Sequence, residues 1–238
     1  MPASQRHNAP HAETRVERRK ARTRVGLLAA ARQLFAARGL EHTTIAQIAE
    51  HADIAIGSFY NYFRTKEELL DALLEDELSQ QLALLELRQV HVQDPAEKIS
   101  VAHRHLVRAA QSDSDWAWLL VRLEVPFRAA WSVLGHSARS DLDAAIEAGR
   151  FHVVDPALAL NASGGALFAV IHAQLVGERS EQADVLHAEG VLRSFGLDRT
   201  EAAEIARRAL PEPVDLAEEH ARTCEPANSG TSPIRRSS

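Results

Sequence analysis

The sequence predicts an all-α fold in which a small amino-terminal group of helices is joined to a larger helical part. Apolar residues recur at helical spacing, and no stretch of useful length alternates apolar and polar residues as a strand does. The 238 residues, 45% of them hydrophobic, are enough for a substantial core. They allow one large domain, or a small domain joined to a larger one.

The first two helices are indicated by their faces and caps. Between residues 25 and 35 the apolar residues share one helical face, and Gly39 then ends the helix. The members of that face are Leu27, Leu28, Ala31, Leu34 and Phe35. Thr44 with Gln47 has the spacing of a capping box and predicts a helix of two turns. Its inner face would carry Ile45, Ile48 and Ala49.

A break and two further helices follow. The stretch Ala-Asp-Ile at residues 52–54 interrupts the pattern, and a third short helix is predicted from about Ile56 to Phe63. Thr65 with Glu68 marks the start of a fourth, long helix, over residues 66–88.

The third helix has two chemically different sides. At about 100° per residue, Ile56, Phe59 and Phe63 share one side. The other side presents Gly57, Ser58, Asn61 and Tyr62, with Tyr60 on the flank. Two helices joined by a short turn, the second with a polar face, indicate a helix-turn-helix whose second helix enters the major groove of DNA. The alternative is a small helical hairpin within a larger core.

Charge is unevenly distributed. Residues 1–66 hold 11 Lys and Arg against five acids, a net charge of +6, whereas the whole chain carries -6 and the remainder therefore -12. A basic amino-terminal part on an acidic body favours a polyanionic partner for the former only. A solvated run of charges is the alternative explanation.

Residues 24–74 resemble the DNA-binding domain of the tetracycline-repressor (TetR) family of transcriptional regulators. The resemblance is carried by "LFAARG", "TTIAQIAEHADIAIGSFYNYF" and "TKEEL" in this order and spacing. It implies a homodimer that binds a palindromic operator in double-stranded DNA, with a larger helical domain for ligand binding and dimerisation. That the regulator is a repressor rests on the resemblance alone.

The resemblance also implies contacts with DNA. Thr43 and Thr44 correspond to positions that meet phosphates, and Lys66 to one that meets the DNA backbone. The recognition helix would present Ser58, Tyr60, Asn61 and Tyr62, and the small Gly57 would allow close approach of the backbone. Three positions depart from the common pattern, namely Asp53, Ala55 and Ile56. Asp53 is compatible with a left-handed turn, but Ile56 cannot donate a hydrogen bond to a base.

Helical patterns continue downstream. One helix is expected to begin near Pro95, a second to cover "WAWLLVRLEVPF" before Pro126, and a third to span residues 127–148 and end at Gly149. Residues 154–177 and 180–197 follow as a pair, where the TetR family forms an intersubunit four-helix bundle. Small residues that would let partner helices approach closely are Ala162, Gly165, Ala166, Ala169 and Ala173. Packing within one subunit is the alternative.

Most large rings lie outside the DNA-binding part. A pocket for a small apolar or aromatic effector is predicted within residues 95–178 because large rings among small side chains, with a few polar groups, are typical of such sites. The candidate lining residues are Trp116, Trp118, Phe127, Trp131, Phe168 and His172. The same rings could instead simply fill a core.

The domain limits follow from these patterns. We expect a disordered basic arm at residues 1–20, the helix-turn-helix domain at 21–66, the ligand-binding and dimerisation domain at 67–210, and a polar, disordered tail at 211–238.

Other classes of protein are less well supported. The sequence shows no cofactor motif, no metal-binding cluster of Cys and His, and no catalytic motif, so no cofactor, no metal and no enzymatic activity are expected. Residues 156–177 are apolar enough for a membrane span, but their Asn, Ser, His and Gln favour a buried helix. The single Cys224 and the polar amino terminus indicate a cytoplasmic protein. A constitutive or architectural DNA binder, or an all-helical enzyme or carrier, remains the alternative.

Overall fold

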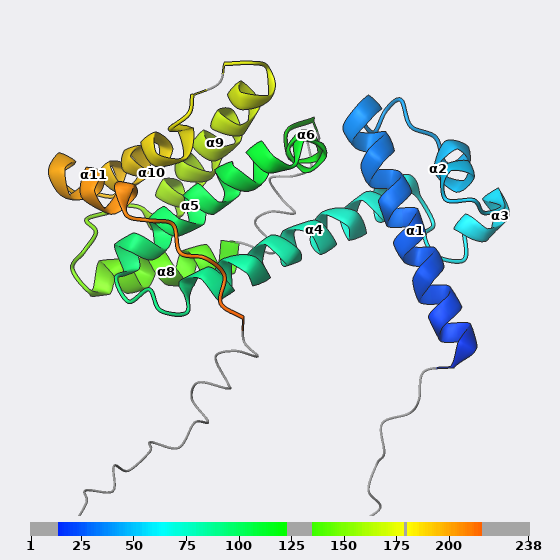
Figure 1. Ribbon diagram of the computed structural model, residues 1–238, viewed down its shortest axis with the longest axis horizontal. Coiled ribbons are helices and arrows are strands. Elements are labelled where there is room, and N and C mark those ends of the chain that lie inside the picture. The colour runs from blue at the N-terminus through cyan, green and yellow to red at the C-terminus, as the bar shows by residue number, and fades with distance from the viewer. Residues whose placement is uncertain (1–13, 123–134, 179, 216–238) are drawn as a thin grey trace, which may run out of the picture.

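A computed structural model describes residues 14–122, 135–178 and 180–215, and all regular secondary structure in these residues is helical. Figure 1 shows two bodies joined by one long helix. Helices α1, α2 and α3 form the smaller body, and the helices from α5 onwards form the larger body around the far half of α4.

Helix α1, Arg15–Arg38, starts earlier than predicted. The Thr14 side chain accepts a hydrogen bond from the Glu17 backbone amide, and the Glu17 carboxylate accepts one from the Thr14 amide. This capping box satisfies two amide groups that a helix start leaves without partners. The prediction that the arm is disordered through residue 20 is therefore wrong from Arg15 onwards, and residues 1–13 lie outside the described part. Gly39, with a φ of 77°, ends the helix as expected.

The second helix, α2, spans Ile45–His51, and the predicted capping box of Thr44 and Gln47 is present. After α2 the chain turns at Asp53, whose φ of 52° lies in the left-handed region that Asp tolerates better than most residues. The turn leads directly into α3.

Helix α3 is only Ile56–Phe59, shorter than the predicted helix to Phe63. The chain then forms a turn in which the Tyr62 and Phe63 amides both donate to the Phe59 carbonyl, at 2.9 and 3.1 Å. This turn keeps Phe59 and Phe63 buried, but Ile56 is 52% exposed. The expectation that Ile56 shares the buried side is thus wrong: Ile56 is the first residue of a helix of only four residues, and its side chain is left exposed at that end.

A single hydrophobic core holds the smaller body together. It is built from α1, α2, the aromatic pair of α3 and its turn, and the first turns of α4, including Leu27, Phe35, Ile48, Phe59 and Leu73. One further member, Leu119, comes from α6 in the other half of the chain.

Helix α4, Lys66–Gln89, starts at the predicted cap, where the Thr65 hydroxyl accepts from the Glu68 amide at 3.1 Å. It passes from the first body into the second and contributes Leu69 and Leu73 to the one and Leu78 to the other. One rigid element therefore joins the two cores.

The larger body contains six further described helices, arranged around a central one. The central helix α5, Pro95–Ser112, contacts all the others. The others are α6 (Ser114–Arg122), α8 (Gly135–Glu147), α9 (Pro156–Leu175), α10 (Ala183–Ser194) and α11 (Arg199–Arg207). Asp94 and Asp155 cap α5 and α9, each before a proline in the first turn. Residues 127–134 of the predicted helix before Gly149 lie outside the described part.

The chain after α11 runs back along α4. The Val214 amide donates to the Leu87 carbonyl at 3.2 Å, and the Arg88 guanidinium donates to the Pro211 carbonyl. The predicted polar tail therefore packs against the body through these residues, and residues 216–238 lie outside the description.

Candidate DNA-binding surface and ligand cavity

The outer side of α3 and its turn forms the candidate base-reading surface. Gly57 and Asn61 are exposed, Tyr60 is 55% exposed, and Ser58 and Tyr62 are partly buried. A Cβ atom at Gly57 would meet no atom within 4 Å, so the fold itself does not require glycine there. The Tyr60 ring meets the edge of Phe59 with ring centroids 5.5 Å apart, which positions its exposed part on a buried anchor.

The two threonines before α2 have different surroundings. Thr44 is exposed and caps the helix. Thr43 is only 1% exposed, and its hydroxyl donates to the Gly39 carbonyl at 2.8 Å. The expectation that the Thr43 side chain meets phosphate is corrected by this burial: its hydroxyl holds the turn between α1 and α2.

Lys66 also contacts this turn. Its Nζ atom donates to the carbonyl of Leu40 at 2.9 Å and to that of Thr43 at 3.4 Å. An ammonium group has three N–H donors, so one remains for a phosphate. Lys66 therefore joins α4 to the start of α2, whatever further contact it makes.

The basic residues predicted for the amino-terminal part include the first turns of α1, whose helical structure the sequence prediction missed. Arg15, Arg18, Arg19, Lys20 and Arg22 are all exposed on a helix rather than on a disordered arm. The signal that predicts this helix is the spacing of Thr14 and Glu17, a capping box immediately before the basic run.

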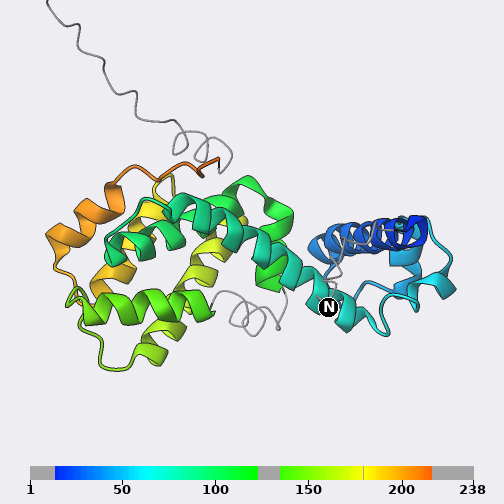
Figure 2. The ribbon, with the colours of Figure 1, turned by 90° about the horizontal axis from the view of Figure 1, so that it is seen from below.

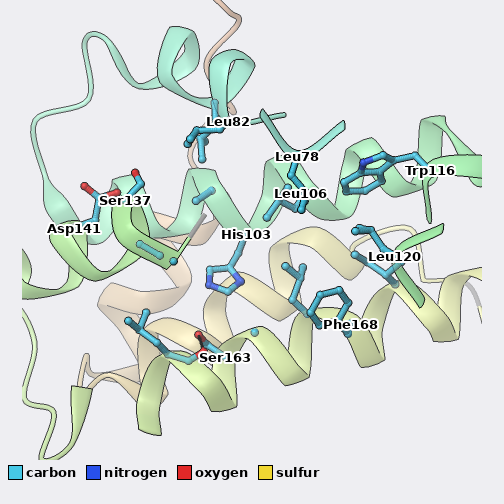
Figure 3. Close-up of a pocket in the computed structure, with 18 residues that line it drawn as sticks. Leu78, Leu82, His103, Leu106, Trp116, Leu120, Ser137, Asp141, Ser163 and Phe168 are labelled. Atoms are coloured by element: carbon cyan, nitrogen blue, oxygen red, sulfur yellow. Dashed lines mark hydrogen bonds between the residues drawn. The ribbon is translucent and has the colours of Figure 1, made fainter. Parts of the chain in front are cut away.

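A cavity of about 120 Å³ lies inside the larger body, between α4, α5, α6, α8 and α9 (Figure 3). Of the predicted lining residues, Trp116 and Phe168 line it. Trp118 does not, because it lies two residues from Trp116 and so on another side of α6. His172 is exposed on α9, and Phe127 and Trp131 lie outside the described residues. The predictions for Trp118 and His172 are therefore wrong.

The cavity also has polar lining residues that the sequence prediction did not include. They are His103 of α5, Ser137 and Asp141 of α8, and Ser163 of α9. His103 Nδ1 lies 2.9 Å from Nε2 of His187 on α10. Burial lowers the pKa of His103 to about 3 and that of His187 to about 4, while burial raises the pKa of Asp141. Both rings are consequently neutral near pH 7.

Helix α6 connects the cavity with the smaller body. Its Trp116 and Leu120 line the cavity, whereas Leu119 is buried in the core of the smaller body. Asp113 caps α6 by accepting from the Trp116 amide at 3.0 Å, and the same carboxylate accepts from Arg32 of α1.

Arg32 also binds the fourth helix. Its Nε donates to Glu77 of α4 at 2.8 Å, and its guanidinium lies 3.9 Å from Asp115. Arg32 thus holds α1, α4 and the start of α6 in one arrangement.

The side of α9 that faces away from the cavity carries mostly small residues, and the described part of the chain leaves it exposed. The small residues predicted for a helix–helix interface between subunits lie on this side. Ala162, Gly165, Ala166 and Ala169 are exposed, and Ala173 is partly buried. Leu158 and Val176 extend this surface at both ends. By length and composition alone, α9 is also the one described helix that could cross a membrane.

Two family models match the chain. Residues 27–73 match bacterial regulatory proteins of the tetR family, and residues 94–208 match the carboxy-terminal domain of tetracyclin repressor-like proteins. Together they cover both bodies of the structure.

Curated relatives match mainly in the smaller body. The repressor KstR2 of Mycobacterium tuberculosis is 50% identical over 48 residues, 20% of this chain and 24% of the relative. The regulator TcmR of Streptomyces glaucescens is 36% identical over 88 residues, 37% of this chain and 38% of the relative. The chain thus spans about a quarter to two fifths of the length of these relatives.

Solved structures extend the similarity to the whole fold. RolR in complex with its ligand resorcinol is 36% identical, with a TM-score of 0.70 over 84% of this chain and 100% of RolR. SmeT, the repressor of a Stenotrophomonas maltophilia multidrug efflux pump, shares the fold with a TM-score of 0.65 at 21% identity, over 82% of this chain and all of SmeT. With the helix-turn-helix, the helical body and both family models in agreement, the chain belongs to the TetR family of transcriptional regulators.

Proposed function

We propose that the protein is a homodimeric repressor that binds a palindromic operator and releases it when a small apolar or aromatic compound occupies the cavity. The observation that carries this proposal is the double attachment of α6, whose neighbouring residues line the cavity and enter the core of the DNA-binding body. A cytoplasmic location and the absence of enzymatic activity belong to the same proposal.

The DNA-binding part of the proposal assigns roles by exposure. Gly57, Ser58, Tyr60, Asn61 and Tyr62 face the major groove, because they line the outer side of α3 and its turn. Thr44, Lys66 and the basic first turns of α1 meet phosphates, and Thr43 supports them from inside. We place the boundary between the domains at residues 66 and 67, within the first turn of α4.

A second copy of the chain covers the exposed side of α9. One recognition helix reads too few bases for specificity, and a two-fold dimer reads two half-sites. The small residues of α9 allow close helix packing, and their exposure in one subunit supports packing between subunits rather than within one. The same contact accounts for the apolar composition of α9 without requiring that this helix cross a membrane.

In this proposal, the protein releases the operator when the bound compound displaces α6 and α4. A compound between Trp116, Leu120 and Phe168 presses on α6, which is fixed to α1 through Leu119 and Arg32. Such a compound weakens DNA binding only if it binds more tightly to the conformation that does not bind DNA, so DNA must weaken its binding equally. The resorcinol complex of RolR supports an aromatic compound for this chain also.

The proposal can be tested with purified protein. Selection from a random DNA library should return a palindromic consensus, and light scattering should give a dimer. A compound library screened by thermal shift, with and without that consensus DNA, should contain compounds that both stabilise the protein and weaken DNA binding. Stabilising compounds that leave DNA affinity unchanged would favour a constitutive DNA binder instead.

A further inference from the structure

The cavity is polar at one end and apolar at the other. Figure 3 shows Ser137 and Asp141 at one end and Trp116 and Leu120 at the other, with His103 projecting from α5 between them. Ser163 lies beside His103, and its hydroxyl donates to the Leu160 carbonyl at 3.0 Å, which leaves its oxygen free to accept. A ligand that fills this space needs an apolar body and a polar group on one edge.

The volume limits the body to about one ring. A cavity of about 120 Å³ is slightly smaller than the engineered apolar cavity of about 150 Å³ that holds benzene. Trp116 and Phe168 supply aromatic walls, against which another ring packs favourably.

His103 supplies an atom that can select the polar group. Its Nδ1 is paired with His187, and its Nε2 has no hydrogen-bond partner among the described residues. Because the two rings are neutral, one nitrogen of the pair donates and the other accepts. If His103 donates to His187, its Nε2 is an acceptor, and if it accepts, its Nε2 is a donor. A hydroxyl group satisfies either arrangement.

The described lining of the cavity favours a neutral ligand over an anion. Among the described residues that line it, none is Lys or Arg, and Asp141 is the acidic group at the polar end. A carboxylate bound there would lie next to the Asp141 carboxyl group, and no described lining residue carries a positive charge to compensate it. Lys98 acts on Asp141 electrostatically but does not line the cavity.

We propose that the effector is a neutral, single-ring aromatic compound with a hydroxyl group, and that the hydroxyl is held by Nε2 of His103. This inference rests on the proposed function, since it names the class of compound that the same cavity takes. It also assigns the His103–His187 pair, which joins α5 to α10, as the group that recognises the hydroxyl.

The test compares compounds of one ring size with purified full-length protein. Titration calorimetry with phenol, resorcinol, toluene and benzoate should give binding of phenol and resorcinol at least tenfold tighter than toluene, and still weaker binding of benzoate. His103→Leu should weaken phenol binding about tenfold while toluene binding stays within about twofold. His103→Gln should recover part of the loss, because an amide also donates and accepts.

Two controls keep the test decisive. His136→Leu, at an exposed position on α8 next to Ser137, should bind phenol like the wild type. If His103→Leu does not fold, phenol should still shift the imidazole nitrogen resonances of His103 and His187 in the wild-type protein. Benzoate or toluene binding as tightly as phenol, or phenol binding without a shift at these nitrogens, would overturn the assignment.

Operator release is measured separately, so that the two proposals can fail independently. Phenol that binds through His103 but leaves operator affinity unchanged would keep the assigned ligand class and the role of His103, but would show that such a ligand does not release the operator. A different compound that releases the operator while phenol and resorcinol fail to bind would do the reverse.

Discussion

Leu119 and Leu120 are neighbours on α6, yet they are buried in different bodies: Leu119 in the core of the DNA-binding body and Leu120 in the wall of the cavity. Neighbouring residues of a helix point about 100° apart, so one short helix can serve two cores. A movement of this helix cannot be confined to one body, because protein cores are closely packed and respond to small displacements.

Arg32→Gln should weaken the communication between the two bodies. The substitution removes the charge that binds Glu77, Asp113 and Asp115, while the cavity and α3 keep their residues. We expect operator affinity and effector affinity, each measured alone, to stay within a few-fold of the wild type. The factor by which bound effector lowers operator affinity, typically about 5- to 150-fold, should fall severalfold.

The measurement is operator binding by fluorescence anisotropy, with and without saturating effector. Arg139→Gln is the matched control because Arg139, among the described residues, pairs only with Asp143 in an exposed contact within α8. Coupling that is unchanged in Arg32→Gln would show that Arg32 is merely structural.

Phe59→Ala and Tyr60→Ala should separate stability from recognition. Phe59 is fully buried, and its removal should lower the free energy of unfolding by about 3 to 5 kcal/mol. Tyr60 is largely exposed, so its removal should weaken operator binding with little effect on stability. Urea unfolding followed by circular dichroism and operator titration would check both. Equal stability losses in the two variants would contradict the assigned orientation of α3.

Lys66→Ala should affect both the turn before α2 and DNA binding. Loss of the charged hydrogen bonds to the Leu40 and Thr43 carbonyls should cost about 1 to 3 kcal/mol. If the third N–H of Lys66 meets a phosphate, DNA affinity should fall for all sequences alike. The slope of the logarithm of the binding constant against the logarithm of salt concentration should also become shallower by about one unit. Arg64→Ala, which removes an exposed cation paired only with Glu68 among the described residues, is the comparison. An unchanged unfolding midpoint in Lys66→Ala would rule out the structural role.

Ala166→Glu should prevent assembly. It places a charge in the middle of the uncovered side of α9, where a like charge from a second copy would lie close by in a two-fold arrangement. Size-exclusion chromatography with light scattering should show a monomer, and operator affinity should fall at least tenfold. Ala144→Glu makes the same change at an exposed position of α8 and should stay dimeric. A dimer in both variants would move the interface away from α9.

Acidification should destabilise the larger body through its buried histidines. Burial lowers the pKa of His103 to about 3, and burial lowers that of His105 and of His187 to about 4, below an unfolded value of about 6.5. The unfolded chain therefore binds more protons in this range. Stability is fully present above about pH 6.5 and is lost as pH falls towards 4, by up to about 1.4 kcal/mol per pH unit and histidine. Urea midpoints measured between pH 7.5 and 5 would check this, and a flat profile would contradict it.

The helix boundaries followed largely from local chemistry. Thr44, Thr65 and Pro95 mark helix starts in the sequence, and Gly39 marks an end, because capping depends on residues within one turn. The prediction of a disordered arm over residues 1–20 overlooks the same kind of local signal, the capping box of Thr14 and Glu17.

The site required information that no local pattern holds. Thr43 and Lys66 meet across the turn between α1 and α2, and only the packed fold shows that both serve this turn. His103, Asp141 and Ser163 come from three helices and meet only at the cavity. Aromatic content therefore identified two wall residues, Trp116 and Phe168, but not the polar end.

A dimer formed through the exposed side of α9 would make operator occupancy depend on gene dose in a non-linear way. If a second copy covers it, the DNA-binding species is a pair, and its concentration rises with the square of the free subunit concentration when subunits are scarce. Halving the amount of protein then lowers the amount of active repressor about fourfold in that regime. A subunit with an intact α9 and a defective α3 would also occupy functional partners, so that one damaged copy of the gene could suppress an intact one.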